Sequence, residues 1–221
     1  KQWKLFWYSK FPFIHLHHFK IIMKEKIIAK ATQLFLKLGF KSVTMDDIAN
    51  EMCISKKTIY KFFSNKEILI EEITDMIHSE IHEIVDQIVA ENNNAIEENY
   101  KIRRMFKEMF KAADTSPVYQ LKKHYPSIFE KVMAREMNEC NILFKNNIEK
   151  GIAQGLYRKE IPVKTFVKFY YNLLFSIKEQ TISEKEGQEL ELQILEYHTR
   201  AIATLEGIAE LEKQLLNIEK Q

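Results

Sequence analysis

Residues that make turns are scarce in this chain. It holds five glycines and four prolines in 221 residues, and no glycine lies between Gly39 and Gly151. A protein built of strands needs such residues at frequent intervals to reverse direction, so the composition argues against a β-rich fold. Long stretches rich in Lys, Glu, Ile and Leu are typical of helices, and we expect an all-α protein.

Cysteine is rarer still, and long apolar runs are missing. Cys53 and Cys140 lie far apart without CxxC spacing, and we find no secretory signal, so neither a disulfide framework nor a structural zinc site is expected. We therefore expect a protein of the reducing cytoplasm. No apolar run approaches the roughly 20 residues that a membrane-spanning helix needs. With 46% apolar residues, the chain still has ample material for a core.

The net charge of +2 hides an uneven distribution. Residues 1–22 contain four lysines and no acid, and residues 23–70 contain nine lysines against five acids, so each segment carries +4. The remainder, residues 71–221, carries −6. The basic charge of residues 1–70 indicates contact with a polyanion. The acidic charge of residues 71–221 indicates that this part of the chain has a different function.

The first 22 residues differ from the rest of the chain. They contain seven aromatic residues and no acid, and Met23 then opens a regular helical pattern. Our hypothesis is that Met23 is the natural start and that residues 1–22 are a non-native or flexible extension. The alternative is an arm on a membrane surface, although Pro12 would interrupt a long amphipathic helix there. The aromatic residues of such an arm would be Trp3, Phe6, Trp7 and Phe11.

A first helix and the start of a second are marked clearly in the sequence. Apolar residues spaced three and four apart predict a helix over residues 24–38, and Gly39 follows where a left-handed residue would end it. Thr44 and Asp47 then form a capping box, the signal that begins a short second helix.

A tight turn and two further helices follow. Cys53-Ile54-Ser55 leaves room only for a turn before a third helix over residues 56–62, with Ser55 as its N-cap. A second capping box, from Ser64 to Glu67, predicts a long fourth helix that reaches to about Ala90. Two short helices joined by a short turn and flanked by long ones are typical of a helix-turn-helix.

The charge of this segment agrees with DNA binding. The segment from Cys53 to Lys66, with both ends included, contains four lysines and no acid. In a helix-turn-helix the N-terminal end of the second of the two helices enters the major groove, so we expect the third helix to do so. The helix N-termini at Thr44 and at Ser64 to Lys66 could each receive a phosphate.

Residues 27–70 resemble the DNA-binding domain of the TetR (tetracycline repressor) family. The matching features are Leu38-Gly39-Phe40, Thr44-x-x-x-Ile48-Ala49, the Ile54-Ser55 turn, Thr58-x-Tyr60-x-Phe62-Phe63 and Lys66-Glu67-x-Leu69. The resemblance implies that Thr44, Lys56, Thr58, Tyr60, Lys61 and Lys66 contact operator DNA, and our candidate set adds Ser55 and Lys57. Ordinary solvation of a short helix by its lysines is the alternative. We expect Phe62 and Phe63 to belong to the core and Tyr60 to be exposed.

The resemblance also implies a function and a domain organisation. It implies a homodimeric, ligand-responsive transcriptional regulator, most often a repressor, that binds a palindromic operator in double-stranded DNA and is released by a small molecule. We assign residues 23–68 to the DNA-binding domain and residues 69–221 to a helical effector-binding and dimerisation domain. An activator or a nucleoid-associated protein is an alternative within the same chemistry.

Further helices are predicted over residues 95–113, 117–123, 126–154 and 162–182. Family members place an effector cavity among such helices. Methionines and aromatic residues here suit an adaptable apolar pocket, so we expect a hydrophobic effector, with ordinary core packing as the alternative for each residue. The candidates are Met105, Met109, Phe110, Tyr125, Met133, Met137 and Phe144.

His78 and His82 are four residues apart and would lie on one face of the fourth helix. A metal ion needs a third ligand, and none lies nearby in the sequence. We therefore expect two solvated histidines and no metal or other cofactor. We also find no nucleophile motif or phosphate-binding loop, so an enzyme is not expected.

The last two long predicted helices, which contain Phe166 to Ile177 and Leu190 to Leu205, carry apolar residues on two sides. This pattern predicts that one face packs on the core of the domain and the other on a partner. The resemblance implies that the partner is a second copy, in a four-helix bundle. The candidate interface residues are Phe166, Tyr170, Leu173, Ile177, Leu190, Ile194, Tyr197 and Ala201. A closing helix is expected from Leu205 to Leu216.

Overall fold

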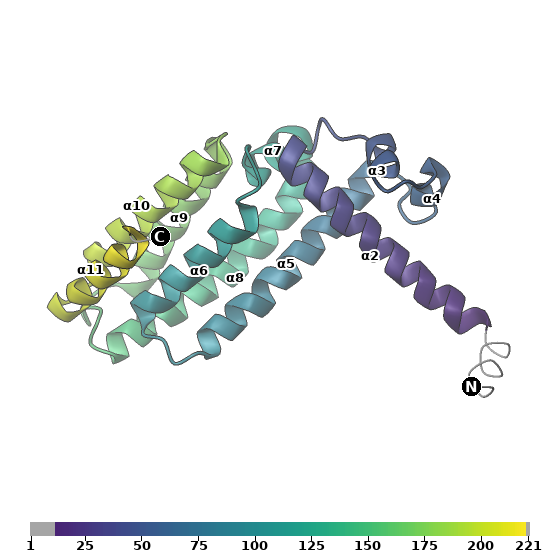
Figure 1. The fold of residues 1–221 in the computed structure, drawn as a ribbon. Coiled ribbons are helices and arrows are strands. Elements are labelled where there is room, and N and C mark those ends of the chain that lie inside the picture. The colour runs from purple at the N-terminus through teal and green to yellow at the C-terminus, as the bar shows by residue number, and fades with distance from the viewer. Residues whose placement is uncertain (1–11, 220–221) are drawn as a thin grey trace. The chain divides into compact units, whose positions relative to one another are not determined.

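The structure is a computed structural model that describes residues 12–219, with side chains described for residues 21–218. Within these residues all regular elements are helices, apart from two isolated β-bridges, which confirms the all-α prediction. The helices are labelled in Figure 1. The chain divides into two compact units, and the boundary falls after Ile73, inside a helix.

The first unit is a small helical domain. It contains α2 (Pro12–Leu38), α3 (Met45–Glu51), α4 (Lys56–Tyr60) and the first part of α5 (Lys66–Ala90). Its core takes almost fully buried side chains from all four helices and from the loop between α4 and α5. Each large one stabilises the unit by roughly 1.5–3 kcal/mol. These residues are Ile27, Ala31, Phe35, Ile48, Ile59, Phe63, Leu69, Ile70 and Ile73.

The beginning of α2 differs from the prediction. We expected the first helix to begin near Lys24, whereas α2 is already helical at Pro12. Proline is tolerated in the first turn of a helix, because its missing N–H would have no partner there in any case. The end is as predicted: Gly39, with φ 88°, donates its N–H to the Phe35 carbonyl at 2.9 Å. The aromatic residues proposed for a membrane-surface arm, Trp3, Phe6, Trp7 and Phe11, lie outside the described residues.

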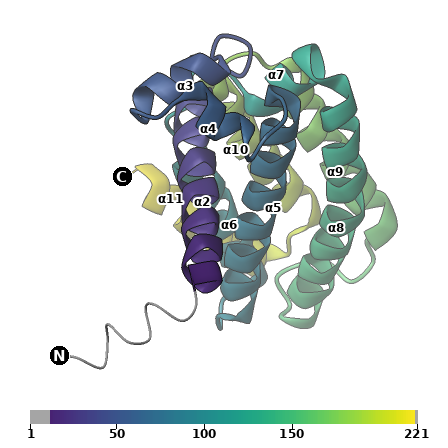
Figure 2. The same ribbon diagram turned by 90° about the vertical axis from the view of Figure 1, so that its right-hand side faces the viewer.

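The second unit contains the rest of α5 and the helices that follow it. These are α6 (Ala95–Phe110), α7 (Pro117–His124), α8 (Pro126–Ala153), α9 (Val163–Gln180), α10 (Glu184–Ile202) and α11 (Leu205–Glu219). α9 packs against α8 and α10, and α8 and α9 run side by side in Figure 2. α6 packs against α8, α10 and α11. In the described part of the chain, no helix is long and apolar enough to cross a membrane.

Tyr157 belongs to the core of the second unit and is 1% exposed. Its ring packs directly on the backbone of α8 at Gly151, where an added Cβ would lie 2.0 Å from the ring carbon Cδ2. Only a residue without a side chain lets the helix and the ring approach this closely.

A buried polar network joins α6 to α8. Glu98 is 2% exposed, and its carboxylate accepts hydrogen bonds from the Lys150 ammonium at 2.6 Å and from Asn147 Nδ2 at 2.7 Å. Asn147 Nδ2 also lies 2.9 Å from the Ala95 carbonyl oxygen, to which it donates. A buried carboxylate needs such partners, because its desolvation would otherwise be very costly.

Candidate DNA-binding site

The predicted capping box at the start of α3 is present. The Thr44 hydroxyl accepts a hydrogen bond from the Asp47 N–H at 3.1 Å, and Asp47 Oδ2 accepts from the Thr44 N–H at 2.8 Å. The Thr44 hydroxyl also donates to Asp47 Oδ2 at 2.7 Å. Together these bonds, the one from the backbone first, lower the pKa of the Asp47 carboxyl. The N–H and the hydroxyl of Thr44 are thus both hydrogen-bonded to Asp47.

The turn between α3 and α4 relies on one unusual backbone conformation. Cys53 has φ 53°, in the left-handed region that residues other than glycine rarely adopt. Ser55 then caps α4, since its hydroxyl accepts from the Thr58 N–H at 3.1 Å. The Ser55 and Thr58 hydroxyls are 2.8 Å apart. Ile59 is fully buried and holds α4 on the core, so the opposite side of α4 faces outward.

The outward side of α4 is basic, as predicted. Lys56, Lys57 and Lys61 are exposed, and Tyr60 is 42% exposed. Among the described residues, Lys57 and Lys61 make no ion pair. Lys56 differs, because its ammonium lies 2.8 Å from Asp46 and that hydrogen bond raises the lysine pKa. No spacing in the sequence indicates this pairing between consecutive helices.

α4 is shorter than predicted, and α5 begins differently. α4 ends at Tyr60 rather than at residue 62. Phe63 is fully buried and Phe62 is half-buried, so the prediction that both belong to the core holds completely for Phe63 only. The cap of α5 is Asn65, whose Oδ1 accepts from the Ile68 N–H at 2.9 Å, and not the predicted Ser64.

Lys66 lies partly inside the first unit. Its ammonium donates to the Lys41 carbonyl at 3.3 Å and lies 5.7 Å from the centre of the Phe35 ring. Burial lowers the pKa of this lysine. Through this hydrogen bond Lys66 stabilises the loop between α2 and α3, a role that the sequence did not indicate.

The first unit matches a known family. Residues 27–73 match the family model described as bacterial regulatory proteins, tetR family. Residues 27–73 are a domain of the TetR family. This agrees with the resemblance drawn from the capping and turn residues, and it identifies α3 and α4 of this TetR-family domain as its helix-turn-helix.

The wider comparisons agree with this assignment. The chain is 26% identical over 162 residues to the HTH-type transcriptional regulator YhgD of Bacillus subtilis. This match covers 71% of this chain and 85% of YhgD. It is 31% identical over 88 residues to IcaR of Staphylococcus aureus, named as the HTH-type negative transcriptional regulator of the biofilm operon icaADBC. That match covers 40% of this chain and 44% of IcaR. The crystal structure of a transcriptional regulator from Cytophaga hutchinsonii has the same fold, with a TM-score of 0.66, 18% identity and coverage of 81% of this chain and 98% of that one.

The candidate effector-binding residues of the second unit differ in their exposure to solvent. Most of them are half-buried, namely Met105, Met109, Phe110, Tyr125, Met133 and Phe144. Met137 is 49% exposed. The Phe144 ring lies 4.8 Å from the Tyr170 ring and packs against the core of the unit, the position that ordinary core packing predicts.

Polar groups that no sequence motif marks also lie on these helices. Lys178 Nζ is 2.9 Å from Glu191 Oε1 and 5.1 Å from the centre of the Phe106 ring. Arg103 donates from Nη2 to the Gln188 carbonyl at 3.1 Å. Among the described residues, Arg103 Nε and the Tyr100 hydroxyl are buried without a hydrogen-bond partner.

The candidate interface residues divide into two groups. Tyr170 and Ile194 are each 8% exposed and belong to the core of the single chain. Phe166 and Ile177 pack against that core, and Leu190 and Ala201 are half-buried. Leu173 is 41% exposed and Tyr197 66% exposed, and Phe169 beside them is 56% exposed. The apolar sequence stripe thus contains both faces of the α9–α10 pair.

Proposed function

We propose that this TetR-family protein is a transcriptional repressor. It binds a palindromic operator as a homodimer and releases it when a hydrophobic small molecule binds the second unit. The main support is the outward side of α4, which is basic and free of acids while its inner side is fixed by Ile59. IcaR, a relative of this chain, is named as a negative regulator, which favours repression over activation.

The contacts with DNA are proposed residue by residue. Lys57, Tyr60 and Lys61 are exposed, and Lys57 and Lys61 would meet the operator without breaking an ion pair among the described residues. Lys56 would exchange Asp46 for a phosphate, a replacement that costs little because the pair is exposed. Four further residues support the site by holding the helix ends and the loop before α3, and each could also contact the DNA itself. These are Thr44, Ser55, Thr58 and Lys66.

The proposed dimer face is the exposed apolar side of α9 and α10. The Tyr170 and His198 rings stack at 4.3 Å, so the preceding residues Phe169 and Tyr197 lie at the same level of the helix pair. With Leu173 they form an apolar surface that a second copy would cover. Tyr170 and Ile194 would support this face from beneath.

The proposed effector is a hydrophobic molecule with a polar end. Met105, Met109 and Phe110 lie on α6, the helix that also carries Tyr100 and Arg103. Flexible thioethers and aromatic rings would contact the apolar part, and the buried Arg103 Nε and Tyr100 hydroxyl would bind the polar end. Release of the operator requires that this ligand bind more tightly to the conformation that does not bind DNA.

The test is selection of duplexes from a random DNA pool, followed by fluorescence anisotropy with the enriched duplex. We expect a palindromic consensus, and we expect Tyr60→Ala to weaken binding by about tenfold, or roughly 1.4 kcal/mol. Lys185→Ala removes an exposed lysine of α10 and is the matched control, which should bind as the unchanged protein does. Failure to enrich any sequence, together with salt-independent binding, would refute DNA recognition by α4.

Two further measurements test the remaining parts of the proposal. Sedimentation equilibrium should show a dimer that Tyr197→Glu and Phe169→Glu convert to monomer, and a monomeric unchanged protein would contradict the dimer face. Lipophilic compounds should be titrated against the protein–DNA complex. A ligand that tightens DNA binding, instead of releasing the protein, would contradict release as the response.

A further inference from the structure

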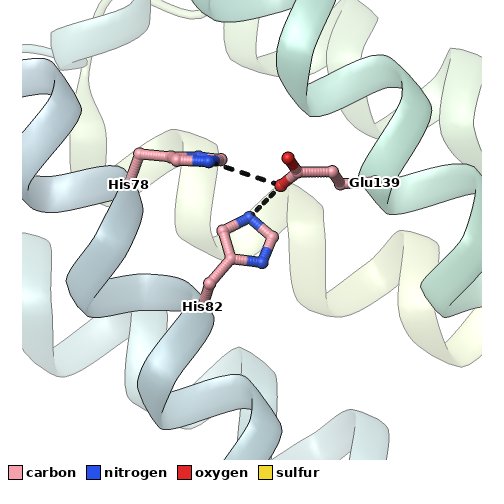
Figure 3. Close-up of side chains that lie close together, drawn as sticks. All are labelled: His78, His82 and Glu139. Atoms are coloured by element: carbon pink, nitrogen blue, oxygen red, sulfur yellow. Dashed lines mark ion pairs between the residues drawn. The ribbon is translucent and has the colours of Figure 1, made fainter.

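Three possible metal ligands meet between two helices of the second unit. His78 and His82 lie one turn apart on α5, and Glu139 reaches them from α8 (Figure 3). His78 Nε2 is 3.4 Å from Glu139 Oε2, and His82 Nε2 contacts the same oxygen. All three ligand atoms lie within 4.8 Å of one another. Glu139 is the third ligand that the sequence around the two histidines does not provide.

The orientation of His78 is fixed by a second carboxylate. His78 Nδ1 lies 2.6 Å from Glu136 Oε1. An ionised carboxylate can only accept a hydrogen bond, so Nδ1 carries the proton and donates it. In the neutral ring, Nε2 then presents its lone pair to the space beside Glu139. Metal-binding histidines are commonly held in this way, with the outer nitrogen donating to a carboxylate.

The other two ligand atoms contact each other but form no regular hydrogen bond. His82 Nε2 and Glu139 Oε2 are shielded from solvent, and neither has a hydrogen-bond partner of suitable geometry among the described residues. The side chains are only partly exposed, His78 to 14% and Glu139 to 35%. Two carboxylates, Glu136 and Glu139, face two imidazoles here, while the nearby Arg135 is paired with Asp75 at 2.8 Å. The cluster therefore favours a bound positive charge.

We propose that His78, His82 and Glu139 form a binding site for a divalent transition-metal ion of the zinc class. Two imidazole nitrogens and one carboxylate oxygen are ligands that zinc accepts, with a water completing the tetrahedron. Bonds of about 2.05 Å in a tetrahedron place neighbouring ligand atoms about 3.3 Å apart, close to the observed 3.4 Å between His78 Nε2 and Glu139 Oε2. His82 and Glu139 would separate to admit the ion. Magnesium and calcium prefer oxygen ligands alone and are not expected here.

The test is isothermal titration of the metal-stripped full chain with zinc chloride. His15, His17 and His18 near the N-terminus could bind zinc independently, so all measurements use a background in which these three are alanine. We expect one ion per chain, with His82→Ala and Glu139→Gln each weakening binding by more than about tenfold. Glu136→Ala should weaken it by about 10–100-fold through loss of the hydrogen bond to His78. Glu83→Gln, an exposed carboxylate of α5, is the matched control and should bind normally.

Two spectroscopic and thermal readouts separate metal binding from a purely structural role. Cobalt(II) should give the visible absorption of a tetrahedral ion, and Glu139→Gln should abolish it. Zinc should raise the Tm of the background protein, because the folded state alone has the site, and should leave the Tm of Glu139→Gln unchanged. Absence of zinc and cobalt binding would overturn the proposal, as would equal affinity of the background protein, His82→Ala and Glu139→Gln for zinc. The cluster would then be an ion-paired contact between α5 and α8.

Discussion

The exposed lysines of α4 and the buried ion pairs of the second unit show two different placements of charged side chains. In the first unit the lysines of α4 lie on the outside, and Lys57 and Lys61 make no ion pair among the described residues. In the second unit, buried or half-buried charges are paired between helices, such as Glu98 with Lys150 and Lys178 with Glu191. Exposed, unpaired lysines are available to an external polyanion, whereas inward pairs hold helices together. The difference separates the surface that we propose binds DNA from a unit whose helices are joined by inward ion pairs.

The largest expected effect tests the inward pairs. Glu98→Ala leaves Lys150 and Asn147 without their buried partner, so we expect it to lower the free energy of unfolding by about 3–5 kcal/mol. Urea denaturation followed by circular dichroism measures this. The exposed Glu108, which pairs with Lys111 at 2.8 Å, is the control, and Glu108→Ala should change stability little. Equal effects of the two substitutions would remove the contrast between buried and surface pairs.

The next effect is a pH dependence located at His198. Burial lowers the pKa of His198 to about 4, from an ordinary value near 6.5. Between these values the unfolded chain binds a proton that the folded chain does not, so stability falls with falling pH by about 1.4 kcal/mol per unit. His198→Phe keeps a ring against Tyr170 and should remove this part of the slope between pH 6.5 and 4. Identical slopes for both proteins would show that His198 is not the responsible group.

A smaller effect tests the exposed lysines of the first unit. Lys57→Ala combined with Lys61→Ala should weaken operator binding and make its salt dependence shallower. The slope of log K against log salt should change by about 0.9 for each DNA phosphate that the variant no longer neutralises. Anisotropy titrations over a salt series measure it, and an unchanged slope would mean that these lysines only solvate α4. The stability of this double variant should change little, in contrast to that of Glu98→Ala.

The smallest expected effect concerns the cap of α3. Thr44→Ala removes the capping box and should destabilise the first unit by about 1 kcal/mol. Hydrogen exchange of the α3 amides would detect this locally, and Thr165→Ala, an exposed threonine of α9, is a suitable control. If exchange in α3 stayed the same, the bonds between Thr44 and Asp47 would have no measurable share in holding the helix.

Sequence reasoning was most accurate where the signals are local. The capping box at Thr44, the cap at Ser55 and the stop at Gly39 all involve residues a few positions apart, and the structure confirms each. Helix lengths followed from apolar spacing to within a few residues, apart from the upstream start of α2 at Pro12.

Interactions between distant residues were not predictable in the same way. The pairing of Lys56 with Asp46 and the bond from Lys66 to the Lys41 carbonyl depend on how helices and loops meet. Glu139 lies more than fifty residues from His78, so no spacing rule connects them. In α9 and α10 the apolar stripe marks both faces, and only packing separates the buried Tyr170 from the exposed Tyr197.

The close packing of the Tyr157 ring on Gly151 has a consequence for the natural variation of this protein. A glycine inside a helix costs about 1 kcal/mol relative to alanine, so drift would ordinarily replace it. Here even alanine would overlap the ring, with its methyl 2.0 Å from Cδ2. In orthologous sequences, residues 151 and 157 should therefore change together or not at all, and a pair such as alanine with a smaller side chain would mark a lineage that repacked its core.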